Sequence, residues 1–388
     1  MPSSMPLAIY RKYRPRTFSE VLGQEAVTKI LKNAASLNRL SHAYLFFGPR
    51  GSGKTTTARL IAKIANCETR QKDENFRKKG EPCNQCRACN EINEGRALDL
   101  IEIDAASNRG IDEIRNLKEG INPSPTSYAY KVFIIDEAHQ LTGYAFNALL
   151  KTLEEPPSHA ILILCTTQVE KIPATIASRT QRFHFKRIPL IMIVQKLEKI
   201  AQLENIEISK QALELIAAAA EGSFRDAESL LDQVASLFLS QIDADQTQID
   251  ADKAINIKNV EEILGRVGFL KTTEMAELLI KAELNKALEY LSKINEEGYN
   301  LVQFNKDLIH YLRRVLSLKL NPNLEEIFKK EITDAELEII KKHSKIADVQ
   351  KAVDLIKSLI EAYTEMRYSP FAIVPLEVAI VEKLKPKT

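Results

Sequence analysis

The sequence predicts an α/β domain built on a parallel sheet, followed by helical domains. Up to about residue 185, short apolar segments alternate with helical patterns. Strands that are apolar on both faces and separated by helices are typical of a parallel sheet covered on both sides. After Phe185 the strand pattern ends, and amphipathic helical patterns continue toward the C-terminus.

Four segments of the first half are expected to be strands: 43–47, 98–103, 131–136 and 161–165. Helices are expected over 189–238, with a break at Glu221–Phe224, and the acidic stretch Ser240–Ala254 suggests a linker. Breaks in the last helical region fall at 295–300, 320–323 and 368–370. We therefore expect domains at 1–187, 188–245 and 255–388.

The composition is that of an ordinary globular protein, with 388 residues, 45% hydrophobic and 27% charged. No apolar run reaches the length of a membrane span, and the first residues do not form a signal peptide. We expect a cytoplasmic protein with reduced thiols and no membrane partner. Residues 1–185 hold 26 Lys/Arg against 19 Asp/Glu, and residues 186–388 hold 28 against 33. This imbalance is too small to indicate nucleic acid by itself.

The segment GPRGSGKT, Gly48–Thr55, matches the phosphate-loop pattern between an expected strand and an expected helix. Backbone N–H groups of such a loop wrap phosphates, Lys54 reaches the β- and γ-phosphates, and the Thr55 hydroxyl holds Mg²⁺. A chance match would lack the flanking strand and helix. The expected nucleotide-binding residues here are Gly48, Pro49, Arg50, Gly51, Ser52, Gly53, Lys54, Thr55 and Thr56.

The segment KVFIIDEAH ends an apolar strand with Asp136 and Glu137. Both carboxylates should lie at the carboxyl edge of the sheet, beside the phosphate loop. Asp136 is expected to bind Mg²⁺ through water, and Glu137 to act as general base toward the attacking water. The letters DEAH also resemble a helicase box, which makes a helicase the alternative.

Cys67, Cys83, Cys86 and Cys89 are spaced C-x15-C-x2-C-x2-C. Four thiolates suit a closed, structural Zn²⁺ site, and two short intervals let one tight turn supply three ligands. An iron–sulfur cluster is the alternative, and zinc is favoured because the rest of the chain shows no redox motif. Cys165, in an expected strand, is interpreted as a buried small hydrophobe.

The chain resembles the gamma/tau subunits of bacterial DNA polymerase III, a family of AAA+ clamp-loader ATPases. The resemblance is dense to about Gln233 and weaker beyond it. The residues that carry the resemblance are the four cysteines and the segments 10–24, 42–55, 99–107, 134–157, 166–179, 221–233 and 368–384.

The resemblance implies an AAA+ domain with a zinc module inserted after its first helix, then a helical lid and an all-α collar domain that oligomerises. It assigns Thr167 as sensor 1 on the γ-phosphate and Arg225 as sensor 2. It makes Arg179 an arginine finger for a neighbouring subunit, although the family reads Ser-Arg-Cys where this chain has Thr180. The segment Leu22–Gln24 resembles the adenine-contacting box.

The resemblance also implies an ATPase that uses ATP, Mg²⁺ and Zn²⁺ to open a sliding clamp and load it onto primer-template DNA. Its partners would be further copies of itself and delta-type subunits. Arg109 and Arg115 are candidates for contacts with the DNA backbone. The intact phosphate loop favours the ATPase over the related non-catalytic delta-prime subunit, and a single Asp–Glu pair indicates hydrolysis, without a polymerase active site. A helicase and a non-catalytic scaffold remain the alternatives.

Overall fold

The structure is a computed structural model that describes residues 7–107, 120–244, 254–265, 267–329, 332 and 334–385. The chain forms two compact units. The first comprises Met1–Ile188 with Gly222–Asp226, and the second comprises Pro189–Glu221 with Ala227–Thr388. The three domain boundaries expected from the sequence remain a prediction.

A five-stranded parallel sheet forms the centre of the first unit, in the order β2-β3-β4-β1-β5. Its strands are β1 Ala43–Phe47, β2 Leu100–Asp104, β3 Lys131–Asp136, β4 Ala160–Thr166 and β5 Gln181–His184. The first four confirm the expected strands to within two residues at each end. The sequence pattern missed β5, an edge strand in which Phe183 is buried and its three neighbours are exposed.

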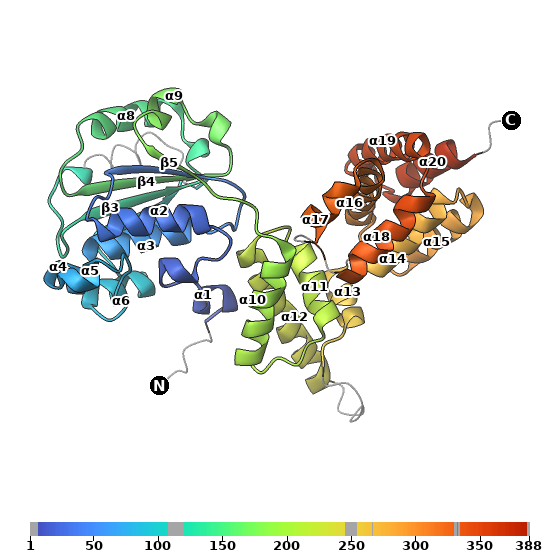
Figure 1. Ribbon diagram of the computed structural model, residues 1–388, viewed down its shortest axis with the longest axis horizontal. Helices are drawn as coiled ribbons and strands as arrows, with labels where there is room; N and C mark the ends of the chain where they lie inside the picture. The colour runs from blue at the N-terminus through green and yellow to red at the C-terminus, as the bar shows by residue number, and fades with distance from the viewer. Residues whose placement is uncertain are drawn as a thin grey trace. The chain divides into compact units, whose positions relative to one another are not determined.

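Helices cover both faces of this sheet, as Figure 1 shows. Tyr44 and Phe46 of β1 pack with α2 (Glu25–Ser36) and α3 (Lys54–Asn66). The intervening Ala43 and Leu45 pack on the opposite face with α8 (Gly143–Glu154) and α9 (Ala174–Ala177). Alternate strand residues point to opposite faces, so the inner strands β1, β3 and β4 each contribute to two hydrophobic cores.

The other described elements within residues 7–188 are short helical segments. Three of them surround the cysteines after α3. The segments are α1 Ile9–Lys12, η1 Phe18–Glu20, α4 Glu68–Lys72, α5 Glu74–Arg77, α6 Arg87–Glu94, η2 Ala138–Gln140 and η3 Val169–Lys171.

The described part of the second unit is helical, apart from an isolated bridge between Ile208 and Ile255. Its first helices are α10 Leu190–Leu203, α11 Lys210–Ala219, α12 Phe224–Ala244 and α13 Ile257–Leu264. Those that follow are α14 Phe269–Ile280, α15 Leu284–Glu296, α16 Leu301–Leu320, η4 Pro322–Leu324, α17 Glu325–Phe328, α18 Asp334–Ile346, α19 Val349–Met366 and α20 Ile373–Leu384.

One hydrophobic core joins the helices after α13, and it includes the buried Phe304 and Leu308 of α16. Together, the sheet and the helices confirm the predicted fold class. Among the described residues, no helix is both long enough and apolar enough to span a membrane.

Candidate functional site

The phosphate loop connects β1 to α3 and depends on glycine at two close approaches. Gly48 has a φ of +146°, and a Cβ there would lie 2.1 Å from the carbonyl oxygen of Phe185. Gly51 has a φ of +68°, and a Cβ there would lie 1.8 Å from Ser223 Oγ. L-residues with a side chain rarely adopt such backbone conformations. The loop is thus packed between the segment after β5 and residues 222–226.

The loop's polar side chains make contacts within the loop and to its neighbours. Ser52 Oγ donates a hydrogen bond to the carbonyl of Pro49 at 2.7 Å. The Gln24 amide, which is 3% exposed, donates to the carbonyls of Ser52 and Lys186 and accepts from the Lys186 N–H. Gln24, expected near adenine, therefore connects the loop to the segment after β5.

Lys54 begins α3 and is 5% exposed. Its Nζ donates to the carbonyls of Gly48 at 2.9 Å and Pro49 at 2.8 Å. Burial lowers the pKa of Lys54. A buried ammonium held at the mouth of the loop is a suitable partner for phosphate oxygens, because an anion would offset its lost hydration.

The two carboxylates lie at the carboxyl end of β3, as expected. Thr55 Oγ1 donates to Asp136 Oδ2 at 2.8 Å, so the two expected magnesium-binding groups are already adjacent. Glu137 follows with a φ of +48°, an unfavourable left-handed conformation for a residue with a side chain. Thr167 Oγ1 donates to Glu137 Oε2 at 2.9 Å, so the expected sensor lies beside the expected base.

The two arginines expected to act on nucleotide, Arg179 and Arg225, make contacts with other side chains. Arg179 donates to Glu154 Oε1 at 2.6 Å and to the Thr175 carbonyl at 2.9 Å. The guanidinium of Arg225 lies 5.2 Å from the centre of the Tyr10 ring, a cation–π geometry within the first unit. Tyr10 was not among the predicted site residues.

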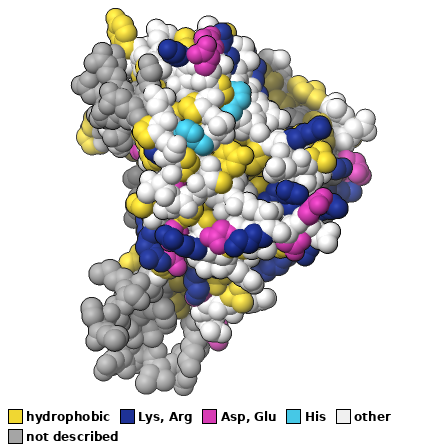
Figure 2. Space-filling view, turned by 90° about the vertical axis from the view of Figure 1, so that its left-hand side faces the viewer, with side chains coloured by type: hydrophobic (Ala, Val, Ile, Leu, Met, Phe, Trp, Pro, Cys, Tyr) yellow, Lys and Arg dark blue, Asp and Glu magenta, His cyan; other side chains and the backbone are white. Residues whose placement is uncertain are grey.

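The two arginines suggested for DNA, Arg109 and Arg115, lie outside the described residues. Among the described side chains on the face shown in Figure 2, Lys and Arg lie among acidic and apolar ones.

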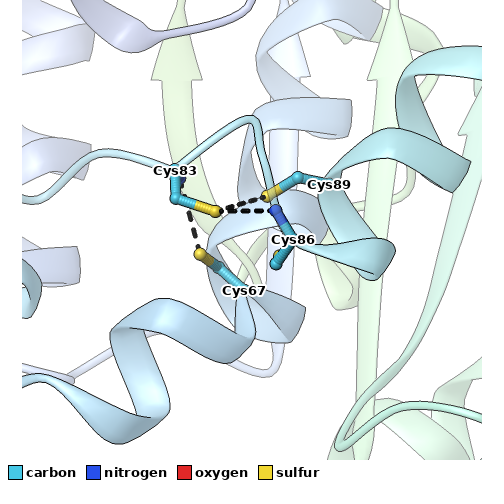
Figure 3. A group of neighbouring side chains, drawn as sticks. All are labelled: Cys67, Cys83, Cys86 and Cys89. Carbon is cyan, nitrogen blue, oxygen red and sulfur yellow. Dashed lines mark hydrogen bonds between the residues drawn. The ribbon is translucent and has the colours of Figure 1, made fainter.

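The four cysteines come together after α3, and Figure 3 shows them converging from the end of α3, a loop and the start of α6. Their Sγ atoms all lie within 4.8 Å of one another. Tetrahedral zinc with Zn–S distances of about 2.3 Å requires S–S separations of about 3.8 Å. The Sγ atoms of Cys83 and Cys89 are 3.9 Å apart, which matches this requirement.

Backbone and charge around the cysteines also suit bound metal. The N–H of Cys83 points to Cys67 Sγ at 3.4 Å, and the N–H of Cys86 points to Cys83 Sγ at 3.2 Å. The contact between the Cys67 and Cys89 sulfurs lowers the pKa of Cys67 and raises that of Cys89, so the first thiolate of the set forms at Cys67. The thiol set therefore fits zinc.

Two buried cations, Lys63 and Arg70, are 2% and 4% exposed. Burial lowers the pKa of both side chains, that of Lys63 to about 8, and the neighbouring cysteines oppose this by favouring the charged forms. Both side chains also tie the module to its surroundings, because Lys63 donates to Asn93 of α6 and to the Arg16 carbonyl, and Arg70 to Ala35 of α2. They could balance part of the negative charge of four thiolates around zinc.

Comparison with known proteins agrees with this arrangement. Residues 23–189 match the family profile of the DNA polymerase III delta subunit. Residues 192–237 match the ATPase lid domain of DNA polymerase III clamp loader subunits, and residues 255–385 match domain III of subunits gamma and tau. DNA polymerase III subunit gamma of Buchnera aphidicola subsp. Acyrthosiphon pisum is 33% identical over 96% of this chain and 96% of its own length. The chain belongs to the DNA polymerase III gamma/tau family.

Other members of the gamma/tau family are longer. DNA polymerase III subunit tau of Bacillus subtilis is 41% identical over 97% of this chain, but the chain spans only 62% of that protein. Among solved structures, the Thermotoga maritima RuvB Holliday junction branch migration motor is 19% identical, with a TM-score of 0.45 over 72% of this chain and 85% of that one. A likeness this weak does not bear on the function of a gamma/tau protein.

Proposed function

We propose that this chain is the ATP-hydrolysing subunit of the DNA polymerase III clamp loader. In this proposal, ATP binding drives opening of the sliding clamp and its loading onto primer-template DNA, and hydrolysis releases the loader. The relatives' names and the match to a clamp-loader ATPase lid support this assignment. A cytoplasmic location belongs to the same proposal.

The observation that carries the proposal is that the phosphate loop and the Asp136–Glu137 pair lie together at the carboxyl edge of the sheet. Lys54 would bind the β- and γ-phosphates, with backbone N–H groups of the loop around them. Thr55 and Asp136, already 2.8 Å apart, would hold Mg²⁺, which neutralises phosphate charge when bound. Glu137 would accept the proton of the attacking water. A non-catalytic scaffold would not need this set.

The three remaining polar residues would respond to the bound nucleotide or act on its γ-phosphate. Thr167 donates to Glu137 in the described contacts and would exchange this bond for one to phosphate or water. Arg225, beside Tyr10, would read the bound nucleotide from residues 222–226, which pack on the loop. Arg179 would act on ATP bound by an adjoining subunit, because the family resemblance places it at a subunit boundary.

The cysteine module would be structural. Four thiolates fill the coordination of Zn²⁺, so no position remains for a reacting water. Its zinc would hold α6 and the intervening loop onto α3. The buried Lys63 also joins α3 to α6, and the buried Arg70 of α4 joins this insert to α2. The partners in this proposal are further copies of the chain, delta-type subunits, the sliding clamp and primer-template DNA.

The test is ATPase activity of the loader assembled with its delta-type subunits, measured with and without clamp and primed DNA. We expect hydrolysis that rises when clamp and primed DNA are both present, and that disappears with Lys54→Ala chains. A scaffold would give no Lys54-dependent hydrolysis. A helicase would be stimulated by DNA regardless of the clamp and would separate strands. Either result would contradict the proposal.

A further inference from the structure

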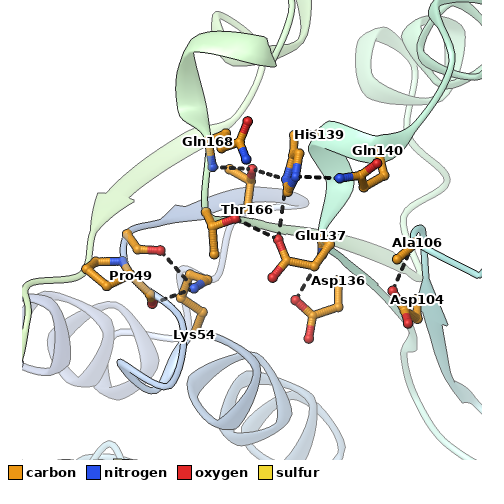
Figure 4. A network of polar contacts seen from close by, with 12 residues as sticks. Pro49, Lys54, Asp104, Ala106, Asp136, Glu137, His139, Gln140, Thr166 and Gln168 are labelled. Carbon is orange, nitrogen blue, oxygen red and sulfur yellow. Dashed lines mark hydrogen bonds and ion pairs between the residues drawn. The ribbon is translucent and has the colours of Figure 1, made fainter. Parts of the chain in front are cut away.

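His139 lies two residues after the expected general base, in η2, and its side chain is 4% exposed. The sequence analysis assigned it no role beyond the letters DEAH. Its Nδ1 lies 3.1 Å from Thr166 Oγ1 and 3.3 Å from Glu137 Oε2. Its Nε2 lies 2.9 Å from Gln140 Nε2. Figure 4 shows the imidazole between β4 and the Glu137 carboxylate.

The partners determine where the imidazole carries its proton. The Gln140 amide nitrogen can only donate, so His139 Nε2 must accept, and a neutral ring then carries its proton on Nδ1. Thr166 Oγ1 already accepts the N–H of Gln168 at 3.0 Å. The Nδ1 proton therefore faces Thr166 Oγ1 and Glu137 Oε2, both of which can accept it.

Glu137 needs such support because its own backbone does not favour its position. Its φ of +48° is unfavourable for a residue with a side chain, so the surrounding contacts must hold it. Within the described residues, the Thr167 hydroxyl and the His139 imidazole both approach the same oxygen, Oε2. Neither of these two contacts involves Oε1.

We propose that His139 is a positioning residue for Glu137. Its Nδ1–H, together with the Thr167 hydroxyl, fixes the carboxylate so that Oε1 accepts the proton of the attacking water. The imidazole itself gains and loses no proton in this step. This inference rests on the proposed ATPase function and adds one residue to it.

The test compares three substitutions of His139 in the assembled loader. In His139→Asn, the side-chain amide can place an N–H near the position of Nδ1, whereas in His139→Gln the amide reaches the position of Nε2. His139→Leu keeps the bulk and removes every donor. A hydrogen bond to a charged group changes an equilibrium about 10- to 100-fold, so we expect kcat to fall by that factor in His139→Leu and His139→Gln. His139→Asn should recover most of the activity, and ATP affinity should be unchanged in all three.

Two controls separate positioning from folding. His159, whose ring contacts the Ile121 carbonyl, offers a matched partly buried histidine, and His159→Asn should retain wild-type kcat. Adding His139→Leu to Glu137→Gln should cause no further loss, because the positioned group is already gone. Thermal unfolding and ATP binding, measured for each variant, show which of them fold.

The outcomes also distinguish this inference from the proposed function. If Glu137→Gln stalls hydrolysis while His139→Leu turns over normally, the role of His139 is overturned and the ATPase stands. If His139→Asn is no better than His139→Leu, the residue acts by packing alone, which also overturns it. If Glu137→Gln hydrolyses ATP at the wild-type rate, the general base itself is wrong, whatever His139 does.

Discussion

Arg179→Ala should leave the fold almost unchanged and yet stop hydrolysis at a neighbouring subunit. In the free chain, Arg179 pairs with Glu154 at 2.6 Å, with the two side chains 35% and 51% exposed. An ion pair this exposed contributes about 0–1 kcal/mol to stability. The free energy of unfolding should therefore fall by no more than about 1 kcal/mol, and ATP binding by the mutant chain should persist.

The catalytic effect should be far larger. An arginine that neutralises charge on the transferring γ-phosphoryl group contributes on the order of 10³ in rate. Loaders assembled only from Arg179→Ala chains should lose activity by about that factor, and loaders assembled only from Lys54→Ala chains should bind no ATP. In loaders that contain both variants, some interfaces place an intact phosphate loop opposite an intact arginine finger. ATPase assays on such mixtures should show partial recovery.

Glu154→Gln and Glu155→Gln serve as controls. Glu154→Gln removes the ion pair and keeps Arg179, so the rate of hydrolysis should stay within a few-fold of wild type. The same result is expected for Glu155→Gln, which changes a neighbouring exposed carboxylate. Lack of recovery in mixtures with proven co-assembly would refute the trans role. Loss of ATP affinity in an isolated Arg179→Ala chain would show that Arg179 acts within its own subunit.

Three further predictions concern the zinc module, the loop and the lysine. In Cys89→Ser, elemental analysis should find well below one zinc ion per chain, while ATP binding should persist. Iron in the wild-type protein, or an unchanged zinc content in the variant, would contradict the zinc site. Gly51→Ala should weaken ATP binding at least 10-fold in a titration, because its Cβ would lie 1.8 Å from Ser223 Oγ. Gly95→Ala has a similar φ of +72° with open space around it and should cost only about 1–2 kcal/mol of stability, with normal ATP binding. Lys54→Ala should abolish ATP binding measured by calorimetry, and retained affinity would remove the lysine from the phosphate site.

Much of the fold was accessible from sequence because its strands are short apolar runs between turn signals. The strand Lys131–Asp136 was predicted to the residue. The edge strand Gln181–His184 was missed because only Phe183 is buried, so neither alternation nor an apolar run marks it. The helices within the cysteine insert are four to eight residues long and give too few turns for a periodic pattern.

The site residues likewise fall into those that the sequence predicted and those that only the structure revealed. Fixed spacing revealed the loop, the Asp–Glu pair and the cysteines, because each motif is local in the chain. The contacts of Gln24 with Lys186 and of Tyr10 with Arg225 join residues far apart in sequence, so no local motif could predict them. His139 stands in the DEAH segment of the sequence, but the positioning role proposed for it depends on its contact with Thr166 of the adjacent strand β4.

The most direct measurement is the separation of binding from chemistry by Glu137→Gln in the assembled loader. Gln cannot accept the proton of the attacking water, so the variant should bind ATP with wild-type affinity and fail to hydrolyse it in a single turnover. Loss of binding, or hydrolysis at the wild-type rate, would contradict the assignment of this chain as an ATPase that uses Glu137.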